Sequence, residues 1–154
     1  MKKISLIISL VAVCFFTACE KPHVPPLGGG GTNNPQDTIV STCDQDVIIS
    51  YDEYHTAPDG QVFILDMKIT GNCLKIKFQA GGCDGSTWVV KLIDIGGVAK
   101  SNPCQRTLRL SLDNQEICDA LPLKEISFNI EDLQIEGDNS VWLIVAGKGI
   151  LYEY

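Results

Sequence analysis

The chain has 154 residues, with 12 basic and 19 acidic side chains and a formal net charge of −7 at pH 7. Phosphate binding needs basic side chains, so this acidic balance argues against nucleic acid or an anionic lipid surface as a partner. The length suits one compact domain once the N-terminal segments are set aside.

The N-terminus has the pattern of a bacterial export signal. Two lysines follow the initiating methionine and precede an apolar run over residues 4–16. As a helix this run would reach roughly 20 Å, which is too short for a bilayer core of roughly 30 Å. It leads into Phe16-Thr17-Ala18-Cys19, which is similar to the lipobox of bacterial lipoproteins. We therefore predict a signal peptide over residues 1–18 and lipid attachment at Cys19.

The predicted anchor sets the location of the protein. Two or more acyl chains hold a protein stably at a membrane surface. Glu20 follows the lipidated cysteine, and by resemblance to sorted lipoproteins this favours the outer membrane over the inner one. The face of the outer membrane, periplasmic or external, stays open. Removing the two lysines of the signal peptide leaves 10 basic against 19 acidic side chains, a net charge of −9.

Residues 19–42 are rich in proline, glycine and asparagine and contain few apolar side chains. Such a composition buries too little apolar surface to offset the entropy of ordering the chain. We predict a flexible linker here, which lets the following domain range roughly 25 Å from the lipid headgroups. The rest of the chain, residues 43–154, is predicted to form a single β-rich domain.

Alternation of apolar and polar residues dominates this domain. A period of two over four to eight residues indicates half-buried strands, and Gly-, Asn- and Pro-containing turns separate them. The alternating apolar residues are Phe63, Leu65, Met67, Ile69, Leu74, Ile76, Phe78, Trp88, Val90, Leu92, Leu108, Leu110, Leu112, Ile126, Phe128 and Ile130. Seven to nine short strands, each with one polar face, predict an all-β antiparallel β-sandwich, immunoglobulin-like in style. A small closed β-barrel is the alternative.

Three local predictions accompany this fold. A hairpin is expected between Leu133–Glu136 and Ser140–Val145, around the turn at Gly137-Asp138-Asn139. The last strand is expected over Ile150–Tyr154, with Ile150, Tyr152 and Tyr154 on one face. Short helical turns are the only helices that the sequence allows, at Asp52–Ala57 and Asn114–Leu121.

Five cysteines lie in the predicted domain, and an oxidising compartment favours their pairing. The spacing alone allows 15 two-bridge arrangements. We favour Cys43–Cys73 and Cys83–Cys118, because the first two each precede an apolar strand and the second two lie in loops. This choice leaves Cys104 unpaired in a turn.

The sequence contains no motif of a known catalytic centre. His55 is the one histidine of residues 43–154, and a loop position is its expected role. No Cys-x-x-Cys or EF-hand spacing is present, so no metal or other cofactor is predicted, with a Ca²⁺ site in acidic loops as a weaker alternative. Those loop carboxylates are Asp44, Asp46, Asp132, Glu136 and Asp138. We therefore predict a protein that is not an enzyme.

The most unusual loop is Gly81-Gly82-Cys83-Asp84-Gly85-Ser86-Thr87-Trp88. One interpretation is a ligand rim formed by Asp84, Ser86 and Trp88. The other, which we favour, is a tight glycine turn fixed by a disulfide, with Trp88 in the core. A second hypothetical binding surface is an aromatic platform for sugars built from Tyr51, Tyr54, Trp142, Tyr152 and Tyr154.

Four segments carry a resemblance: Gly82–Trp88, its continuation Val89–Asp94, then Gln105–Leu112 and Ile150–Tyr154. Together they resemble short, uncharacterised lipid-anchored lipoproteins of Gram-negative bacteria of the gliding, polysaccharide-degrading kind. The resemblance covers most of residues 43–154. It implies export and anchoring, and it brings no activity, cofactor or catalytic residue with it.

These observations lead to one main functional hypothesis and two alternatives. The main one is a non-enzymatic, lipid-anchored envelope module that binds an envelope protein or a glycan. The first alternative is an acidic inhibitor of a secreted basic enzyme such as a lysozyme or protease, whose binding would weaken strongly with salt. The second alternative is a small hydrolase that uses His55 and clustered carboxylates.

Overall fold

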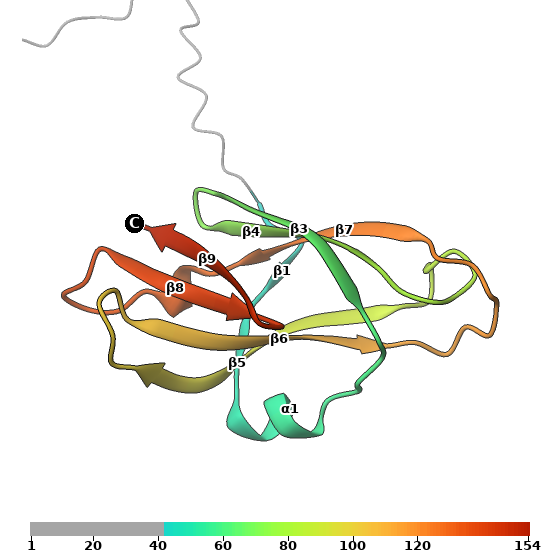
Figure 1. The fold of residues 1–154 in the computed structure, drawn as a ribbon, viewed down its shortest axis with the longest axis horizontal. Helices are drawn as coiled ribbons and strands as arrows, with labels where there is room; N and C mark the ends of the chain where they lie inside the picture. The colour runs from blue at the N-terminus through green and yellow to red at the C-terminus, as the bar shows by residue number, and fades with distance from the viewer. Residues whose placement is uncertain (1–41) are drawn as a thin grey trace, which may run out of the picture. The chain divides into compact units, whose positions relative to one another are not determined.

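The computed structural model describes residues 42–154, which form two β-sheets packed face to face (Figure 1). One sheet has the strand order β1-β7-β4-β3 and the other β2-β5-β6-β8-β9. The strands are β1 (Gln45–Asp46), β2 (Ile48–Ile49), β3 (Phe63–Thr70), β4 (Cys73–Gln79), β5 (Val89–Ala99), β6 (Gln105–Asp113), β7 (Leu123–Asn129), β8 (Ser140–Val145) and β9 (Lys148–Glu153). The β-sandwich is confirmed, and the sheets do not close into a barrel. The predicted signal peptide, Cys19 and nearly all of the linker lie outside the described residues.

The core is made by the inward faces of both sheets, as the alternation predicted. Leu74, Ile76 and Phe78 of β4 are at most 1% exposed, and they face the inward leucines of β6. Tyr152 of β9 is also fully buried, and its hydroxyl donates to Asn72 Oδ1 at 2.7 Å and accepts from Gln134 at 2.8 Å. A buried tyrosine is compatible with a core when its hydroxyl is paired in this way.

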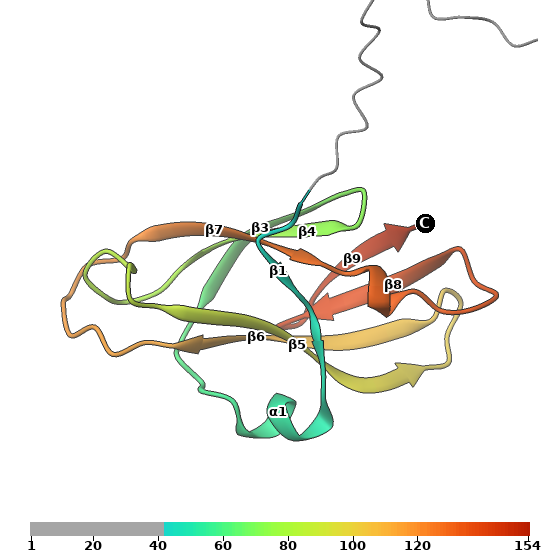
Figure 2. The same cartoon turned by 180° about the vertical axis from the view of Figure 1, so that it is seen from behind.

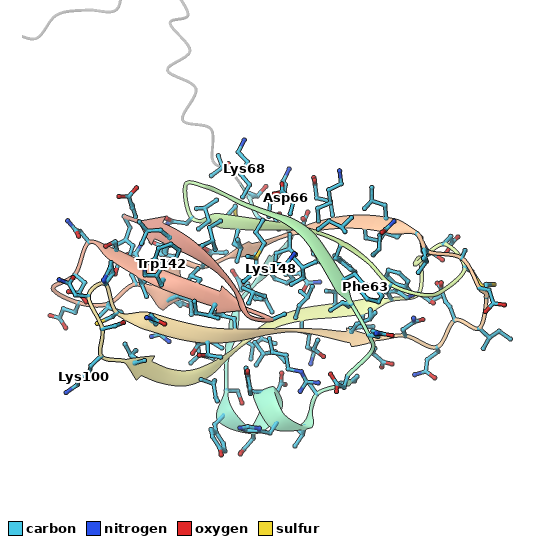
Figure 3. All side chains as sticks on the ribbon, viewed as in Figure 1. Phe63, Asp66, Lys68, Lys100, Trp142 and Lys148 are labelled. Carbon is cyan, nitrogen blue, oxygen red and sulfur yellow. A yellow bond between two sulfur atoms is a disulfide. The ribbon has the colours of Figure 1, made fainter. Side chains whose placement is uncertain are left out.

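Strand β3 differs from the prediction. Its register against β4 shifts between Ile64 and Asp66, which indicates a β-bulge. An extra residue in one strand reverses the alternation beyond it. Ile64 is therefore buried, whereas Phe63 and Leu65 are each 50% exposed. The Lys148 ammonium donates to the Ile64 carbonyl at 2.6 Å, across the space between β3 and β9 (Figure 3).

A short helix, α1 (Tyr51–Thr56), covers the outer side of the five-stranded sheet (Figures 1 and 2). Ser50 caps it by accepting from the Glu53 N–H at 3.2 Å, as expected for a serine N-cap. The helix explains why Ile93, on the outer face of β5, is nonetheless fully buried. The helical turn predicted at Asp52–Ala57 is thus confirmed.

Two local predictions are wrong. Leu133–Glu136 is not a strand: Leu133 ends a 3₁₀ turn, η1 (Glu131–Leu133), and its side chain is fully buried in the core. Strand β8 pairs instead with β9 and, in parallel, with β6. Residues 114–121 form no helix, because Cys118 is bonded to Cys83 and Ala120 pairs with Gly82.

The strand directions are mixed. Most neighbours are antiparallel, but β1–β7, β2–β5 and β6–β8 are parallel. The β6–β8 pair is possible because the chain leaves β6, crosses to the other sheet as β7 and returns through η1. This pairing is short, covering only Gln105–Leu108 against Trp142–Val145.

The disulfides of the structure are the pairs that we favoured. Cys43–Cys73 joins the segment before β1 to the start of β4, and Cys83–Cys118 joins the loop before β5 to the loop after β6. Cys104 is a free, partly exposed thiol just before β6. Each bridge closes a loop of about 30–35 residues and thereby restricts the unfolded chain.

Candidate functional site

The glycine-rich loop before β5 is occupied by a side chain of the protein itself. The Glu116 carboxylate accepts from the N–H groups of Cys83 at 2.5 Å, Gly85 at 3.0 Å and Thr87 at 3.4 Å. The Thr87 hydroxyl adds a fourth bond at 2.9 Å. Burial works against the charged form, but these bonds outweigh it and hold the pKa of Glu116 below its usual value of 4.5.

The three residues of the hypothetical ligand rim have structural roles. The Asp84 carboxylate accepts from the Ser86 N–H at 2.9 Å within the turn. Hydrogen bonding from the Ser86 side chain, together with this N–H contact, lowers the pKa of Asp84. Trp88 is partly buried and stacks on Phe78, with ring centroids 6.0 Å apart. The main-chain N–H groups of Cys83, Gly85, Ser86 and Thr87 are thus already paired, which supports the interpretation as a fixed turn rather than a ligand rim. The indole Nε1 of Trp88, in contrast, is buried without a hydrogen-bond partner.

The proposed aromatic platform does not form. Tyr152 lies in the core, and Tyr154 packs against it with centroids 4.9 Å apart. Tyr51 and Tyr54 instead flank His55 on α1, at 4.5 and 5.2 Å. His55 is exposed, but it lies on α1 rather than in a loop as expected.

The acidic residues near β1 serve the fold. The Asp44 carboxylate accepts from both the hydroxyl and the N–H of Ser127, at 2.6 and 2.8 Å, and these bonds lower the pKa of Asp44. Asp46 accepts from the Asn129 amide at 3.1 Å. Within residues 42–154, no group of three or more His, Cys, Asp or Glu side chains is arranged to hold a metal ion.

One carboxylate lies inside the sandwich. Asp94 of β5 is fully buried, and its burial raises its pKa. One of its oxygens accepts from Arg106 at 2.9 Å and from the Gly96 N–H at 2.6 Å, while the other has no hydrogen-bond partner. Because the charge of Asp94 is paired with Arg106 inside the protein, we assign this ion pair a structural role.

A hollow lies beside β6, at the side of the five-stranded sheet that carries α1. Its volume is about 430 Å³, within the range of roughly 300–1,000 Å³ typical of small-molecule sites. The lining residues are Tyr54, Asp59, Gly60, Gln61, Val62, Thr107, Leu108, Arg109, Leu110, Ile144, Ala146 and Gly147. They come from α1, the segment after it, β6, the end of β8 and the β8–β9 turn.

The hollow coincides with a gap in the hydrogen-bond ladder of the sheet. Along one edge, β6 pairs with β8 as far as Leu108, and further on Leu112 forms an isolated parallel bridge with Asp59. Leu110 lies between these two contacts. We name this feature the ladder gap, and we define it by Leu110 and the lining residues given above.

The main chain of Leu110 points into the ladder gap. The carbonyls of Cys104 and Leu112 both accept hydrogen bonds on this edge of β6, from Trp142 at 2.9 Å and from Gly60 at 3.0 Å. Main-chain groups alternate along a strand with a period of two, so the N–H and C=O of Leu110 face the same way. Within residues 42–154, no pairing or loop hydrogen bond reaches Leu110 from this side.

Arg109 holds one wall of the ladder gap in place. Its guanidinium donates to the carbonyls of Tyr54 at 2.6 Å, Ala57 at 2.9 Å and Pro58 at 3.0 Å. It also pairs with the Asp59 carboxylate at 3.2 Å. These bonds satisfy carbonyls at the C-terminal end of α1, where positive charge is also favoured by the helix dipole.

Two tight turns close the ladder gap along the direction of β6. Gly60 passes so close to β6 that a Cβ atom would lie 2.6 Å from the Leu112 carbonyl oxygen. At the other end, the β8–β9 turn places Ala146 and Gly147 at φ values of 49° and 79°. Gly60 and the β8–β9 turn therefore bound the gap at both ends along the strand. No sequence pattern marked this site, because its residues alternate as in any half-buried strand.

No protein-family model and no curated protein matches the chain. Two solved structures are similar in part: a protein of unknown function, DUF1344, from Bacteroides vulgatus ATCC 8482, and a putative toxin-related protein from Parabacteroides distasonis ATCC 8503. Both are 18% identical over 71% of this chain, with TM-scores of 0.49 and 0.40. The chain spans 56% and 60% of their lengths.

The fold thus defines a two-sheet β-sandwich with a ladder gap in one sheet. In the described part of the chain, no helix is both long and apolar enough to cross a membrane.

Proposed function

We propose that this protein is an exported lipoprotein, held at the outer membrane by lipid on Cys19, whose β-sandwich is a non-enzymatic binding module. The anchoring part is supported by the basic start, the short apolar run and the lipobox-like residues before Cys19. The binding part is carried by one observation, the ladder gap at Leu110.

Unpaired main-chain groups are rare in buried strands, because a lost hydrogen bond there costs free energy. Leu110 is only 5% exposed, yet its N–H and C=O face a hollow rather than a neighbouring strand. A ligand that enters the hollow would supply the missing partners. The fixed walls around it match the largely preformed character of small-molecule sites.

The anchor is tested by metabolic labelling of cells with an alkyne-tagged fatty acid. We expect label on the wild-type chain and on Cys14→Ser, whose cysteine lies in the predicted signal peptide, but not on Cys19→Ser. Label retained by Cys19→Ser would contradict the anchor. Protease treatment of intact cells, with a periplasmic control protein, then decides which face of the outer membrane carries the domain.

The binding site is tested by retention on envelope material. The probe is the mature chain, residues 19–154, with Cys19→Ser so that lipid plays no part. Thr107 is exposed and lines the ladder gap, so Thr107→Trp should fill it and reduce retention at least about 10-fold, or about 1.4 kcal/mol. The matched control is Thr70→Trp, on the exposed end of β3 in the other sheet. Equal retention of both variants would contradict the site.

One observation supports the inhibitor as a second candidate. The segment around η1 carries several carboxylates that form no ion pair within residues 42–154, namely Glu131, Asp132, Glu136 and Asp138. Such charges attract a basic partner over about 10 Å at 0.1 M salt. Inhibition of a basic secreted enzyme that disappears at 0.5 M salt (a Debye length of only a few Å) would favour this candidate.

A further inference from the structure

We propose that the ladder gap binds a neutral sugar, and that two adjacent hydroxyls of the sugar ring pair with the N–H and C=O of Leu110. The inference rests on the proposed binding function and names the chemical class of the ligand. Three properties of the gap support this class of ligand: the donor and acceptor on its floor, its closure along the strand, and its charge.

The floor presents one donor and one acceptor side by side. In an extended strand the N–H and C=O of one residue point to the same side, so a matching ligand needs an acceptor next to a donor. The N–H and C=O of a trans secondary amide point in opposite directions, so one such amide cannot satisfy both. Each hydroxyl both donates and accepts, and neighbouring hydroxyls of a sugar ring therefore supply the required pair.

An added peptide strand does not fit. Strand addition needs a free edge over several residues, because its affinity comes from repeated main-chain hydrogen bonds. Here the edge of β6 is free only at Leu110, between the β8 pairing that ends at Leu108 and the bridge at Leu112. Gly60 and the turn at Ala146 block an extended chain at either end. A compact ligand that enters from outside meets neither obstacle.

The charge of the lining favours a neutral ligand over an anion. Arg109 is the one basic residue among the lining residues given above, and three main-chain carbonyls and Asp59 occupy its guanidinium. The Asp59 side chain is 95% exposed, so its carboxylate remains accessible as an acceptor for hydroxyl groups. Thr107 and Gln61 add neutral hydrogen-bonding groups, and Tyr54 adds an aromatic ring. Together these groups resemble the mixed polar and aromatic lining that orients small polar ligands.

The test is an amide-resolved NMR titration of the mature chain with Cys19→Ser. The probes are neutral glucose, mannose and galactose oligosaccharides, their deoxy analogues that lack one of two adjacent hydroxyls, and an N-acetylated, C-amidated tetrapeptide. We expect saturable shifts centred on Leu110, a loss of affinity of at least about 10-fold for the matching deoxy sugar, and no shift at Leu110 with the peptide. Thr107→Trp should abolish the sugar-induced shifts, whereas Thr70→Trp should keep them.

Hydrogen exchange gives a second readout that does not depend on a variant. Without ligand, the Leu110 amide should exchange faster than the paired amide of Leu108, and sugar should slow it. Binding of the peptide at Leu110 would overturn the inference. So would sugar-induced chemical-shift changes that do not include the Leu110 amide. If no sugar binds while Thr107→Trp still releases the chain from envelope material, the binding function stands and the ligand class is wrong. If neither effect is seen, both proposals fail.

Discussion

Arg109→Met tests the contact that fixes α1 and the following segment against the five-stranded sheet. Methionine keeps the apolar stem but removes every donor of the guanidinium. A net hydrogen bond to a charged group contributes about 1.5–3 kcal/mol, and the three carbonyl bonds share one side chain that is only 20% exposed. Because such bonds are not additive, we expect a loss of about 2–4 kcal/mol in the free energy of unfolding. The Asp59 pair adds little, since its carboxylate is exposed.

The assay is urea unfolding of the mature chain with Cys19→Ser, followed by tryptophan fluorescence. With a slope of about 1–3 kcal/mol per M, the expected loss moves the midpoint by about 1 M or more. Lys91→Met is the matched control, because Lys91 also contacts α1, through Glu53 at 3.6 Å, but in an exposed ion pair. Such a pair contributes about 0–1 kcal/mol. If Arg109→Met cost no more than Lys91→Met, the argument that Arg109 holds the wall would be refuted.

Three further substitutions test other parts of the domain. The lowered pKa of Glu116 means that its stabilising effect is present above the unfolded value of 4.5 and is lost as the pH falls through the lower folded value. The melting temperature of Glu116→Gln should therefore fall less than that of the wild-type chain as the pH is lowered through the acid range. An equal dependence of melting temperature on pH in both proteins would contradict the loop contacts. Arg106→Leu leaves Asp94 buried without its cation and should lower the free energy of unfolding by about 3–5 kcal/mol. Adding Asp94→Leu should recover much of this loss. A double variant that is no more stable than Arg106→Leu alone would contradict the argument. Replacing Cys83 and Cys118 together by serine should lower stability by about 3–4 kcal/mol in the same urea assay, whereas an unchanged midpoint would show that the bridge adds nothing.

Most of the core followed from alternation alone. In β4, β6 and β7 the alternating apolar residues face the opposite sheet, so a period of two suffices to place Leu74, Leu110 and Phe128. Leu123, at the start of β7, falls outside this alternation and is 50% exposed. The short helix after Ser50 was also predictable, because a serine cap precedes it. These features depend on residues close together in sequence, and the side chains themselves determine them.

The errors arose where distant segments decide the local structure. Phe63 and Leu65 have the alternation of inward residues, yet the bulge in β3 leaves both half exposed. No glycine marks this bulge in the sequence, and the Lys148 contact to Ile64 comes from the far end of the chain. Leu133 was assigned to a strand for a similar reason. An isolated buried leucine fits a 3₁₀ turn as well as a strand, and only the pairing of β8 with β9 distinguishes the two.

The ladder gap belongs to the same class of feature, and this explains why no sequence pattern predicted it. Leu110 has the inward alternation of its neighbours, and its special property lies in the main chain, where side-chain periodicity carries no information. The gap exists because the pairing of β6 with β8 ends at Leu108, two residues before Leu110. On the other side, the segment at Asp59 and Gly60 meets β6 only at Leu112, two residues after Leu110. Gly60 is therefore sensitive to substitution: a Cβ there would lie 2.6 Å from the Leu112 carbonyl oxygen, so this wall of the gap would have to shift. A site made in this way depends on strand register, so changes in the turns on either side can alter its size while the core residues stay the same.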